Sequence, residues 1–277
     1  MTRSSPDTTA PPETTTDDFF GGRLSILQPR VGYRSGLDAV LLAASVPVHA
    51  EAPRILDAGA GVGVVGLGVA ARVPFATVTL VEIAPGLAEL ARQNIRRNGL
   101  APRADLVELD IARGGAALHD PGRPASIGPG LFDHVLANPP FHVEGTGTRP
   151  GDARRAVAHQ MPAEGLARWI AFLATAARSG GTLSLIHRAE ALGDLLAALA
   201  GRFGRARVLP VHPRRDQPAR RILIEAVKGS RAPLAILPGL CLQDDTGRYL
   251  PHIDAILRGN ANLTISDTMV TTTAIGH

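Results

Sequence analysis

The feature that most constrains the fold is a short apolar strand that runs directly into a glycine-rich turn and a helix. Residues 55–57 are predicted to form the first strand of a parallel sheet, and Gly59, Gly61 and Gly63 follow it at alternate positions. Glycine lets the backbone approach a ligand closely where a side chain would block it. Residues 64–72 are small and apolar, and they predict the helix that follows the turn.

Strands and helices alternate along the rest of the chain. Further strands are predicted at residues 77–82, 104–109, 132–137, 182–187, 207–211 and 221–227. Helices are predicted at residues 38–44, 85–98, 163–177 and 189–199, the first with Asp38 as its N-cap, and residues 112–130 are predicted to be a loop. This pattern predicts an α/β fold: a doubly wound, mostly parallel sheet with an antiparallel strand pair at its C-terminal edge. Such sheets bind ligands at the carboxyl ends of their strands.

A second motif, Asn138-Pro139-Pro140-Phe141, follows the strand predicted at residues 132–137. Two consecutive prolines continue neither a helix nor a sheet ladder, so they fix the backbone at this point. One amide side chain and one backbone carbonyl then face whatever lies beyond the strand end. Their oxygens are suited to accept hydrogen bonds from a planar group that carries an NH2, and the phenylalanine ring is suited to stack on its face. Asn-Pro is also an ordinary turn signal, and that reading stays open for the motif alone.

The glycine turn by itself also fits an NAD-dependent oxidoreductase. Residues 61–66 match the dinucleotide fingerprint G-x-G-x-x-G, and Glu82 ends the next strand where a ribose-binding acid belongs. Asp57 disfavours that class, because a carboxylate just before the glycines would repel a pyrophosphate but suits a ligand with an ammonium and a sulfonium. The motif that begins at Asn138 is not needed for hydride transfer. Together these features indicate a class I S-adenosylmethionine-dependent methyltransferase.

Composition limits the class of protein and its compartment. The 277 residues suit one large or two small domains, and a hydrophobic content of 45% is normal for a globular protein. No apolar run reaches the ~18 residues expected of a membrane span. Residues 1–18 are rich in Thr, Pro and Ser with several acids, which predicts a disordered tail rather than a targeting signal. The single Cys241 argues against a Cys-rich zinc site, so no metal is expected, and the chain fits a cytoplasmic enzyme.

Arginines gather between residues 202 and 221. Seven occur there with one acid, Asp216, while the net charge of the whole chain is +4. Such a group attracts phosphates, which favours a nucleic-acid partner, but a solvated rim fits the same composition. The arginines are Arg202, Arg205, Arg207, Arg214, Arg215, Arg220 and Arg221.

Several stretches resemble the bacterial tRNA1(Val) adenine-N6-methyltransferase family. The similar segments are residues 32–44 (GYRSGLDAVLLAA), 56–63 (LDAGAGVG), 138–141 (NPPF), 221–229 (RILIEAVKG) and 247–249 (GRY). The resemblance implies a single methyltransferase domain at residues 19–259, followed by a C-terminal tail at 260–277. It also implies S-adenosylmethionine as cofactor and an adenine beside a tRNA anticodon as substrate. Other enzymes with the same tetrapeptide methylate guanine N2 in rRNA or glutamine in a protein, and these alternatives stay open.

The resemblance also implies roles for individual residues. Asp57, Gly59 and Gly61 should line the methionine end of the cofactor, and Glu82 should accept hydrogen bonds from both ribose hydroxyls. Ile83 should lie against the adenine, Asp110 should bond its amino group, and Ile111 should pack on the ring. The expected catalytic residues are Asn138, Pro139, Pro140 and Phe141, with Asn138 also bordering the cofactor.

The implied mechanism needs alignment more than chemistry from the protein, because the sulfonium already activates the methyl group. Asn138 and the Pro139 carbonyl should accept the hydrogens of the target amino group, and Phe141 should stack on the base. The target must be unpaired or extruded, which a loop base allows at low cost. The candidates for phosphate contacts are Arg149, Arg154, Arg155, Arg214 and Arg215. A non-catalytic RNA-binding module is the remaining alternative, disfavoured because the cofactor acids are intact.

Overall fold

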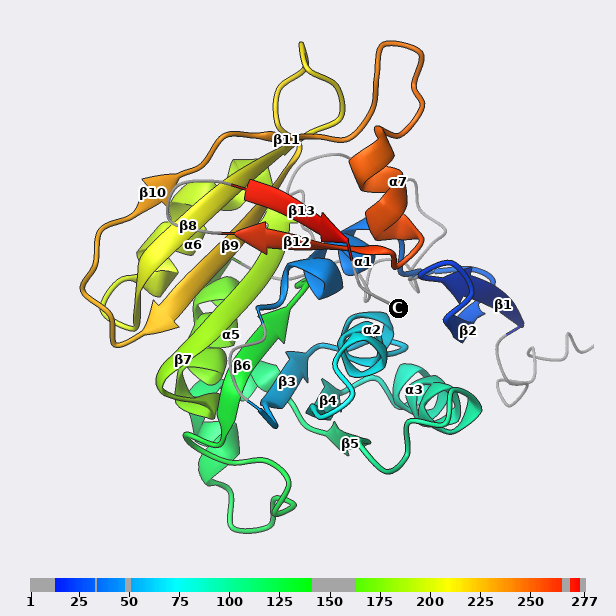
Figure 1. Ribbon diagram of the computed structural model, residues 1–277. Coiled ribbons are helices and arrows are strands. Elements are labelled where there is room, and N and C mark those ends of the chain that lie inside the picture. The colour runs from blue at the N-terminus through cyan, green and yellow to red at the C-terminus, as the bar shows by residue number, and fades with distance from the viewer. Residues whose placement is uncertain (1–12, 33, 48–50, 141–162, 266–269, 275–277) are drawn as a thin grey trace, which may run out of the picture.

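A mixed sheet with helices on both faces forms the centre of the molecule (Figure 1). The computed structural model describes residues 13–32, 34–47, 51–140, 163–265 and 270–274. The strand order in the sheet is β10-β8-β9-β7-β6-β3-β4-β5, and β11 also pairs with β8. The strands are β3 (Arg54–Ala58), β4 (Thr77–Glu82), β5 (Ala104–Glu108), β6 (Phe132–Ala137), β7 (Ala177–Arg188), β8 (Phe203–His212), β9 (Arg221–Lys228), β10 (Ala235–Ile236) and β11 (Leu240–Cys241).

Neighbouring strands from β5 to β7 are parallel, and β9 runs antiparallel to both β7 and β8. The predicted α/β fold and the antiparallel pair of the two late strands are therefore confirmed. Because β9 is antiparallel to both of its neighbours, β7 and β8, the strand β8 runs in the same direction as β7 and the other parallel strands. The loop that follows β8 consequently leaves the sheet at the same edge as the loops after β3, β4 and β6.

Alternate residues of the strands pack into two separate cores. Ile55 and Leu80 belong to the core beneath α1 (Leu37–Ser45), α2 (Val64–Arg72), α3 (Pro85–Arg97) and α7 (Pro251–Leu257). Leu56 and Val81 face the opposite core, beneath the helical segment η1 (Ile111–His119), α5 (Ala163–Ala176) and α6 (Leu192–Leu199), which follows the short η2 (Ala189–Ala191). Successive side chains of a strand point to opposite faces, so a sheet covered on both sides needs apolar runs such as Val-Thr-Leu-Val.

The N-terminal boundary differs from the prediction of a tail at residues 1–18. Within the described residues, β1 (Thr14–Phe19) pairs with β2 (Leu24–Pro29) as an antiparallel hairpin. Buried Asn94 of α3 fastens it, since its Oδ1 accepts from the Leu27 backbone N–H at 2.8 Å. Phe20 at the turn is buried, and its ring lies over Gly68, where a Cβ would be 2.5 Å away. The ordered domain thus begins before residue 19, because tertiary contacts hold a Thr-rich strand that composition alone marks as disordered.

Two further predictions were wrong. Residues after Asp110 form η1 with a kink at Gly114, where a loop was predicted, because Asp110 caps the segment by accepting from the Ala112 N–H. Residues 260–277 are more than a tail: β12 (Ala261–Ile265) and β13 (Val270–Ala274) form a hairpin that packs near α1 and α7.

The predicted N-cap of α1 was also wrong. The helix begins at Leu37 with Gly36 as its N-cap residue, and no side chain caps it. Asp38 lies in the first turn and accepts a hydrogen bond from Arg221 Nε at 2.8 Å. The Asp38–Arg221 ion pair therefore ties α1 to the start of β9, 183 residues further along the chain.

Candidate active site

The carboxyl ends of four neighbouring strands bring the predicted site residues to one edge of the sheet. Ala58 at the end of β3 pairs with Val81 of β4 on one side and with Ala137 of β6 on the other. Glu82 at the end of β4 pairs with Glu108 of β5. Four adjacent strands span about 14 Å at ~4.8 Å per step, enough for an extended ligand to lie across their ends.

The glycine turn after β3 has the left-handed backbone that only glycine adopts without strain. Gly59, Gly61 and Gly63 have φ angles of 66°, 59° and 94°. The Ala60 N–H donates to the Val81 carbonyl at 2.9 Å, which ties the turn to β4. The turn leads into α2, whose N-cap residue is Gly63. The predicted ligand-binding turn is therefore present, with its backbone close to the strand ends.

Glu82 is buried and its carboxylate organises the backbone around it. Oε2 accepts from the Gly61 N–H at 2.8 Å, and Oε1 accepts from the N–H groups of Ile83 at 2.9 Å and Ala84 at 2.8 Å. A carboxylate has about four lone-pair directions, so it retains capacity for a further donor. Glu82 thus joins the glycine turn to the end of β4.

Asp57 lies beneath the same turn and is only 1% exposed. Its Oδ2 accepts from the Gly66 N–H at 2.8 Å, in the first turn of α2, where the helix dipole favours a negative charge. Burial raises the pKa of Asp57 to about 7, the Glu82 charge adds to the rise, and the bond from Gly66 opposes it. Asp57 therefore supports the turn from below and can change its charge near neutral pH.

The end of β5 supplies the third acid of the edge. Asp110 is partly exposed, and its Oδ1 accepts from the Ala112 N–H at 2.8 Å. Ile83, after β4, is 57% exposed, whereas Ile111 is 5% exposed and packs in the core beneath η1. An exposed isoleucine beside a buried strand offers an apolar surface to a ligand, so Ile83 is better placed than Ile111 for the predicted contact.

The Asn138 motif begins one residue beyond Ala137, which pairs with Ala58. Asn138 is partly exposed, Pro139 is buried and Pro140 is partly exposed. The amide therefore stands on the strand next to the one that carries the glycine turn. Phe141, Arg149, Arg154 and Arg155 lie outside the residues that the structure describes.

Trp169 is a neighbour of the turn that the sequence analysis missed. It is the one tryptophan of the chain, it comes from α5, and it is 9% exposed. A Cβ built on Gly59 would lie 2.2 Å from the Trp169 ring, so the ring lies directly against the glycine backbone. No spacing in the sequence connects these two positions, because the contact depends on how α5 crosses the sheet.

Replacing Gly59 with alanine is expected to destabilise the protein by about 2–5 kcal/mol. A left-handed backbone costs a non-glycine residue about 1–2 kcal/mol, and overpacking against Trp169 adds about 1–3 kcal/mol. Urea unfolding measures the loss. Gly99→Ala is the matched control, because Gly99 has a φ of 67° and nothing lies within 4 Å of its built Cβ. Equal losses in the two variants would show that Trp169 does not press on the turn.

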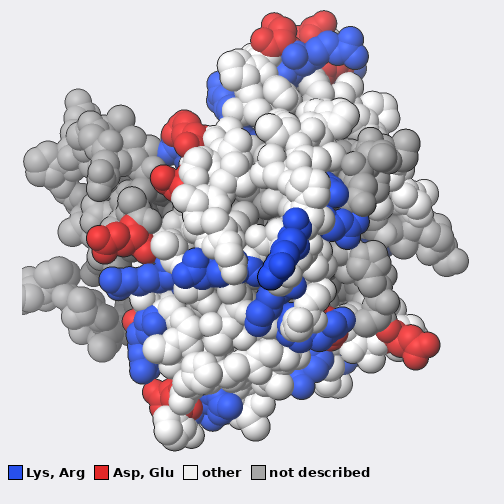
Figure 2. All heavy atoms as spheres, turned by 90° about the vertical axis from the view of Figure 1, so that its left-hand side faces the viewer, with Lys and Arg blue, Asp and Glu red and all other residues white. Residues whose placement is uncertain are grey.

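The predicted group of seven arginines is split by the fold. Arg202, Arg205 and Arg207 lie near the start of β8, whereas Arg214 and Arg215 follow its end. Arg205 and Arg214 are nine residues apart, about 30 Å at ~3.3 Å per residue, whereas Arg207, in the middle of β8, is seven residues from Arg214, about 23 Å. Figure 2 shows the side of the molecule that carries β8 and β10, where Lys and Arg side chains form a band with acidic groups mainly toward its margins. The predicted RNA contacts Arg214 and Arg215 lie at the same sheet edge as Asn138.

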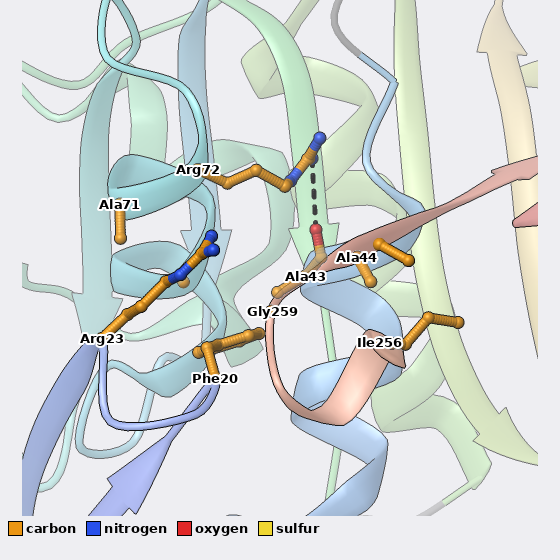
Figure 3. Close-up of a pocket in the computed structure, with 10 residues that line it drawn as sticks. Phe20, Arg23, Ala43, Ala44, Ala71, Arg72, Ile256 and Gly259 are labelled. Carbon is orange, nitrogen blue, oxygen red and sulfur yellow. Dashed lines mark hydrogen bonds between the residues drawn. The ribbon is translucent and has the colours of Figure 1, made fainter. Parts of the chain in front are cut away.

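A small pocket of about 20 Å³, partly open to solvent, lies elsewhere, between the N-terminal hairpin, α1, α2 and α7 (Figure 3). Phe20, Arg23 and Arg72 line it together with small residues. Arg72 Nη2 donates to the carbonyls of Ala43 at 3.2 Å and Val46 at 2.6 Å, and burial lowers the pKa of Arg72 to about 10. None of the predicted site residues lines this pocket, and Arg72 holds the end of α1 there.

Among the described residues, no helix is long and apolar enough to span a membrane. The same residues contain no group of three or more His, Cys, Asp or Glu side chains placed to hold a metal ion.

Comparison with known proteins points in one direction. The family model "Methyltransferase small domain" matches residues 36–165. The tRNA1(Val) (adenine(37)-N6)-methyltransferase of Porphyromonas gingivalis is 31% identical over 219 residues, covering 76% of this chain and 80% of that protein.

Solved structures agree on the fold. An Agrobacterium tumefaciens protein described as a predicted O-methyltransferase has a TM-score of 0.68 and 32% identity, covering 83% of this chain and 99% of that one. The Thermus thermophilus 16S rRNA N2 G1207 methyltransferase, solved with AdoMet and guanosine, has a TM-score of 0.51 and 20% identity over 82% of this chain and 53% of that one.

Proposed function

The chain belongs to the tRNA1(Val) (adenine(37)-N6)-methyltransferase family and is a methyltransferase, and from this we propose that it methylates the exocyclic amino group of a base in RNA. The methyl donor is S-adenosylmethionine, and the target is adenine N6 in a tRNA anticodon loop. The observation that carries the proposal is the position of Asn138, on the strand beside the glycine turn and one residue past the Ala58–Ala137 pair. We place the reaction in the cytoplasm, where tRNA is modified.

The residues at the sheet edge fit this donor. The turn at Gly59 and Gly61 brings its backbone to the strand ends, where the methionine portion would lie, in a left-handed conformation that glycine adopts without strain. Glu82 retains one lone pair on Oε2, beside the bond from the Gly61 N–H, for one ribose hydroxyl, and the second hydroxyl would share an oxygen with the backbone donors. Ile83 offers the apolar surface for the adenine, with Asp110 at its amino group. Ile111 would support this position from the core.

Methyl transfer then depends on how the chain holds the target nitrogen. The donor supplies an activated methyl group on a sulfonium. The Asn138 side-chain oxygen and the Pro139 carbonyl would accept hydrogen bonds from the two N–H groups of the target. These bonds would aim the lone pair of the nitrogen at the methyl group and stabilise the positive charge that grows on the nitrogen. A strong general base is unnecessary, because the nitrogen becomes acidic only as it is methylated. Phe141 would stack on the base, and Pro140 would keep the motif rigid.

The affinity for S-adenosylmethionine is expected to rise with pH through about 7 and to level off above it. In the free protein Asp57 is largely protonated below its pKa of about 7. A positively charged ligand favours the carboxylate and lowers that pKa, so binding releases a proton at acid pH. Affinity should therefore increase by up to about tenfold per pH unit below 7. Titration calorimetry from pH 5.5 to 8.5 measures this change.

Asp57→Asn provides the control for the pH profile. The amide keeps the shape of the side chain and an acceptor for the Gly66 N–H, but it does not titrate. Its affinity should be lower at pH 8 and nearly independent of pH. A parent profile that is flat between pH 6 and 8 would rule out Asp57 as the titrating group.

The alternatives within the same class act on guanine N2 in rRNA, on a protein glutamine, or on oxygen, as the name of the Agrobacterium tumefaciens structure indicates. Acceptors from the Asn138 motif favour an amino group over a hydroxyl. Arg214 and Arg215 at the same edge favour RNA over protein, with Arg149, Arg154 and Arg155 as further proposed phosphate contacts. Incubation of the protein with methyl-labelled S-adenosylmethionine and separate pools of tRNA, rRNA and protein tests the substrate class. Label in tRNA alone supports the proposal, and label only in another pool overturns it.

A NAD-dependent oxidoreductase remains the alternative outside the class. Titration calorimetry with S-adenosylmethionine and with NAD separates the two functions. Saturable binding of S-adenosylmethionine without binding of NAD is expected, because the buried carboxyl group of Asp57 just before the glycine turn disfavours a pyrophosphate.

A further inference from the structure

Two loops lie side by side at the carboxyl edge of the sheet, next to the proposed active site. The first, residues 213–220, follows β8, and the second, residues 242–250, follows β11 (Figure 1, the two loops at the top). Because β11 pairs in parallel with the end of β8, both loops leave the sheet at the same level. The Gln243 N–H donates to the Pro213 carbonyl at 3.0 Å, and a Cβ on Gly247 would lie 3.3 Å from Arg214 Nη2.

Internal hydrogen bonds hold the second loop in one shape. Asp244 Oδ1 accepts from the Thr246 N–H at 2.9 Å, from Thr246 Oγ1 at 2.7 Å and from the Arg248 N–H at 3.1 Å. The Asp244 N–H in turn donates to the Arg248 carbonyl at 2.9 Å, and Gln243 bridges to Tyr249. The bond from Thr246 is the main cause that lowers the pKa of Asp244. The carboxylate is thus committed to the turn, which presents Arg248 and Tyr249 outward.

The first loop is fastened in a similar way. His212 Nδ1 bonds to the Gln217 carbonyl at 2.8 Å, and the Gln217 N–H donates to the Arg214 carbonyl at 3.2 Å. Arg215 and Arg220 are exposed, and Arg214 is partly exposed. Within the described residues, none of these three arginines nor Arg248 forms an ion pair with a carboxylate.

The chemistry of this surface matches single-stranded RNA. It combines arginines that pair with no described carboxylate with an exposed aromatic ring. Tyr249 is 41% exposed, one of a few large apolar or aromatic side chains at the described surface. In single-stranded RNA, unpaired bases stack on aromatic rings and phosphates bond to arginines. An acidic peptide would bond to the arginines but would not need the aromatic ring. Asp216 and Asp245 are also exposed there, so the surface is not uniformly positive.

We propose that the two-loop surface, formed by Arg214, Arg215, Arg248 and Tyr249, binds the single-stranded RNA that flanks the target nucleotide. Tyr249 stacks on an unpaired base, and the arginines contact phosphates. Three strand spacings separate β8 from β6, about 14 Å, so this surface meets neighbouring nucleotides rather than the target itself. The inference rests on the proposed function, because it assumes that RNA is the substrate.

Steady-state kinetics with an unmodified tRNA that the parent methylates test the surface. Tyr249→Ala should raise KM for tRNA by about tenfold and change kcat by less than about twofold. In Tyr249→Phe the ring remains, so KM for tRNA should be close to that of the parent. Arg248→Ala should weaken tRNA binding and reduce the slope of log affinity against log salt by about 0.7–0.9. Arg231→Ala is the control. Arg231 is exposed and follows the end of β9 at the sheet edge opposite the two loops, so this substitution should change neither KM for tRNA nor the salt slope.

The Kd for S-adenosylmethionine and the thermal midpoint establish that each variant is folded. Parent-like KM and salt slope in both Tyr249→Ala and Arg248→Ala would overturn the inference and leave the proposed function intact. If Tyr249→Ala fails to fold, Arg248→Ala decides alone. Failure of the parent to methylate any RNA would instead overturn the proposed function.

Discussion

Replacing Asn138 with alanine is expected to lower kcat for methyl transfer by about 10²–10³-fold. The amide oxygen is proposed to accept a hydrogen bond that strengthens as positive charge grows on the target nitrogen, and loss of one such preorganised group has an effect of about this size. The Kd for S-adenosylmethionine should change only a few-fold, because the glycine turn and Glu82 make the main cofactor contacts in this account. Single-turnover kinetics and titration calorimetry give the two values.

Asn260→Ala is the matched control for this variant. Asn260 is exposed, follows α7 and accepts only a 3.3 Å hydrogen bond from Arg23, so its loss should leave both values unchanged. If Asn138→Ala instead lost cofactor affinity by more than about 50-fold with kcat at saturation preserved, Asn138 would be a binding residue and the proposed transfer geometry would be wrong.

Replacing Glu82 with alanine is expected to weaken S-adenosylmethionine binding by at least about 100-fold. The variant loses the proposed ribose acceptor and leaves the N–H groups of Gly61, Ile83 and Ala84 without their acceptor. A buried donor left unpaired costs about 1–3 kcal/mol, and this applies to the Gly61 N–H, whereas the partly buried N–H groups of Ile83 and Ala84 can bond to water; the cofactor-free protein should therefore also lose about 1–3 kcal/mol of unfolding free energy. Titration calorimetry and urea unfolding measure the two losses separately.

Glu89→Ala is the control for that substitution. Glu89 lies on the exposed face of α3, where it pairs with Arg92 and Arg96 and accepts a hydrogen bond from Gln93; contacts at such an exposed site contribute little, so its loss should change stability by no more than about 0.5 kcal/mol. If Glu82→Ala bound S-adenosylmethionine as tightly as the parent, the carboxyl end of β4 would not be part of the cofactor site.

Much of the central sheet could be predicted because its strands are buried on both faces. β4, β6 and α2 occupy the predicted ranges 77–82, 132–137 and 64–72. Each has a clear boundary signal: Pro85 follows β4 by three residues, an Asn-Pro pair follows β6, and the glycine turn precedes α2. The order of the strands at the sheet edge then follows from the doubly wound pattern, so Glu82 and Asn138 could be assigned to one edge.

The features that could not be predicted from the sequence depend on contacts between distant parts of the chain. The arginines from 202 to 221 look like one group in the sequence, but an extended strand carries its two ends far apart. β1 has little apolar signal, and it is ordered because it pairs with β2, which α3 holds in turn through Asn94. Trp169 meets Gly59 only because α5 packs across the sheet, 110 residues after the turn.

The most direct test of the central claim is mass spectrometry of nucleosides from the tRNA of cells that lack this protein, compared with the parent. If the strand ends at Glu82 and Asn138 hold a methyl donor and an adenine amino group, N6-methyladenosine should disappear from one tRNA and return with the parent gene but not with Asn138→Ala. An unchanged content of N6-methyladenosine in every tRNA would contradict the account.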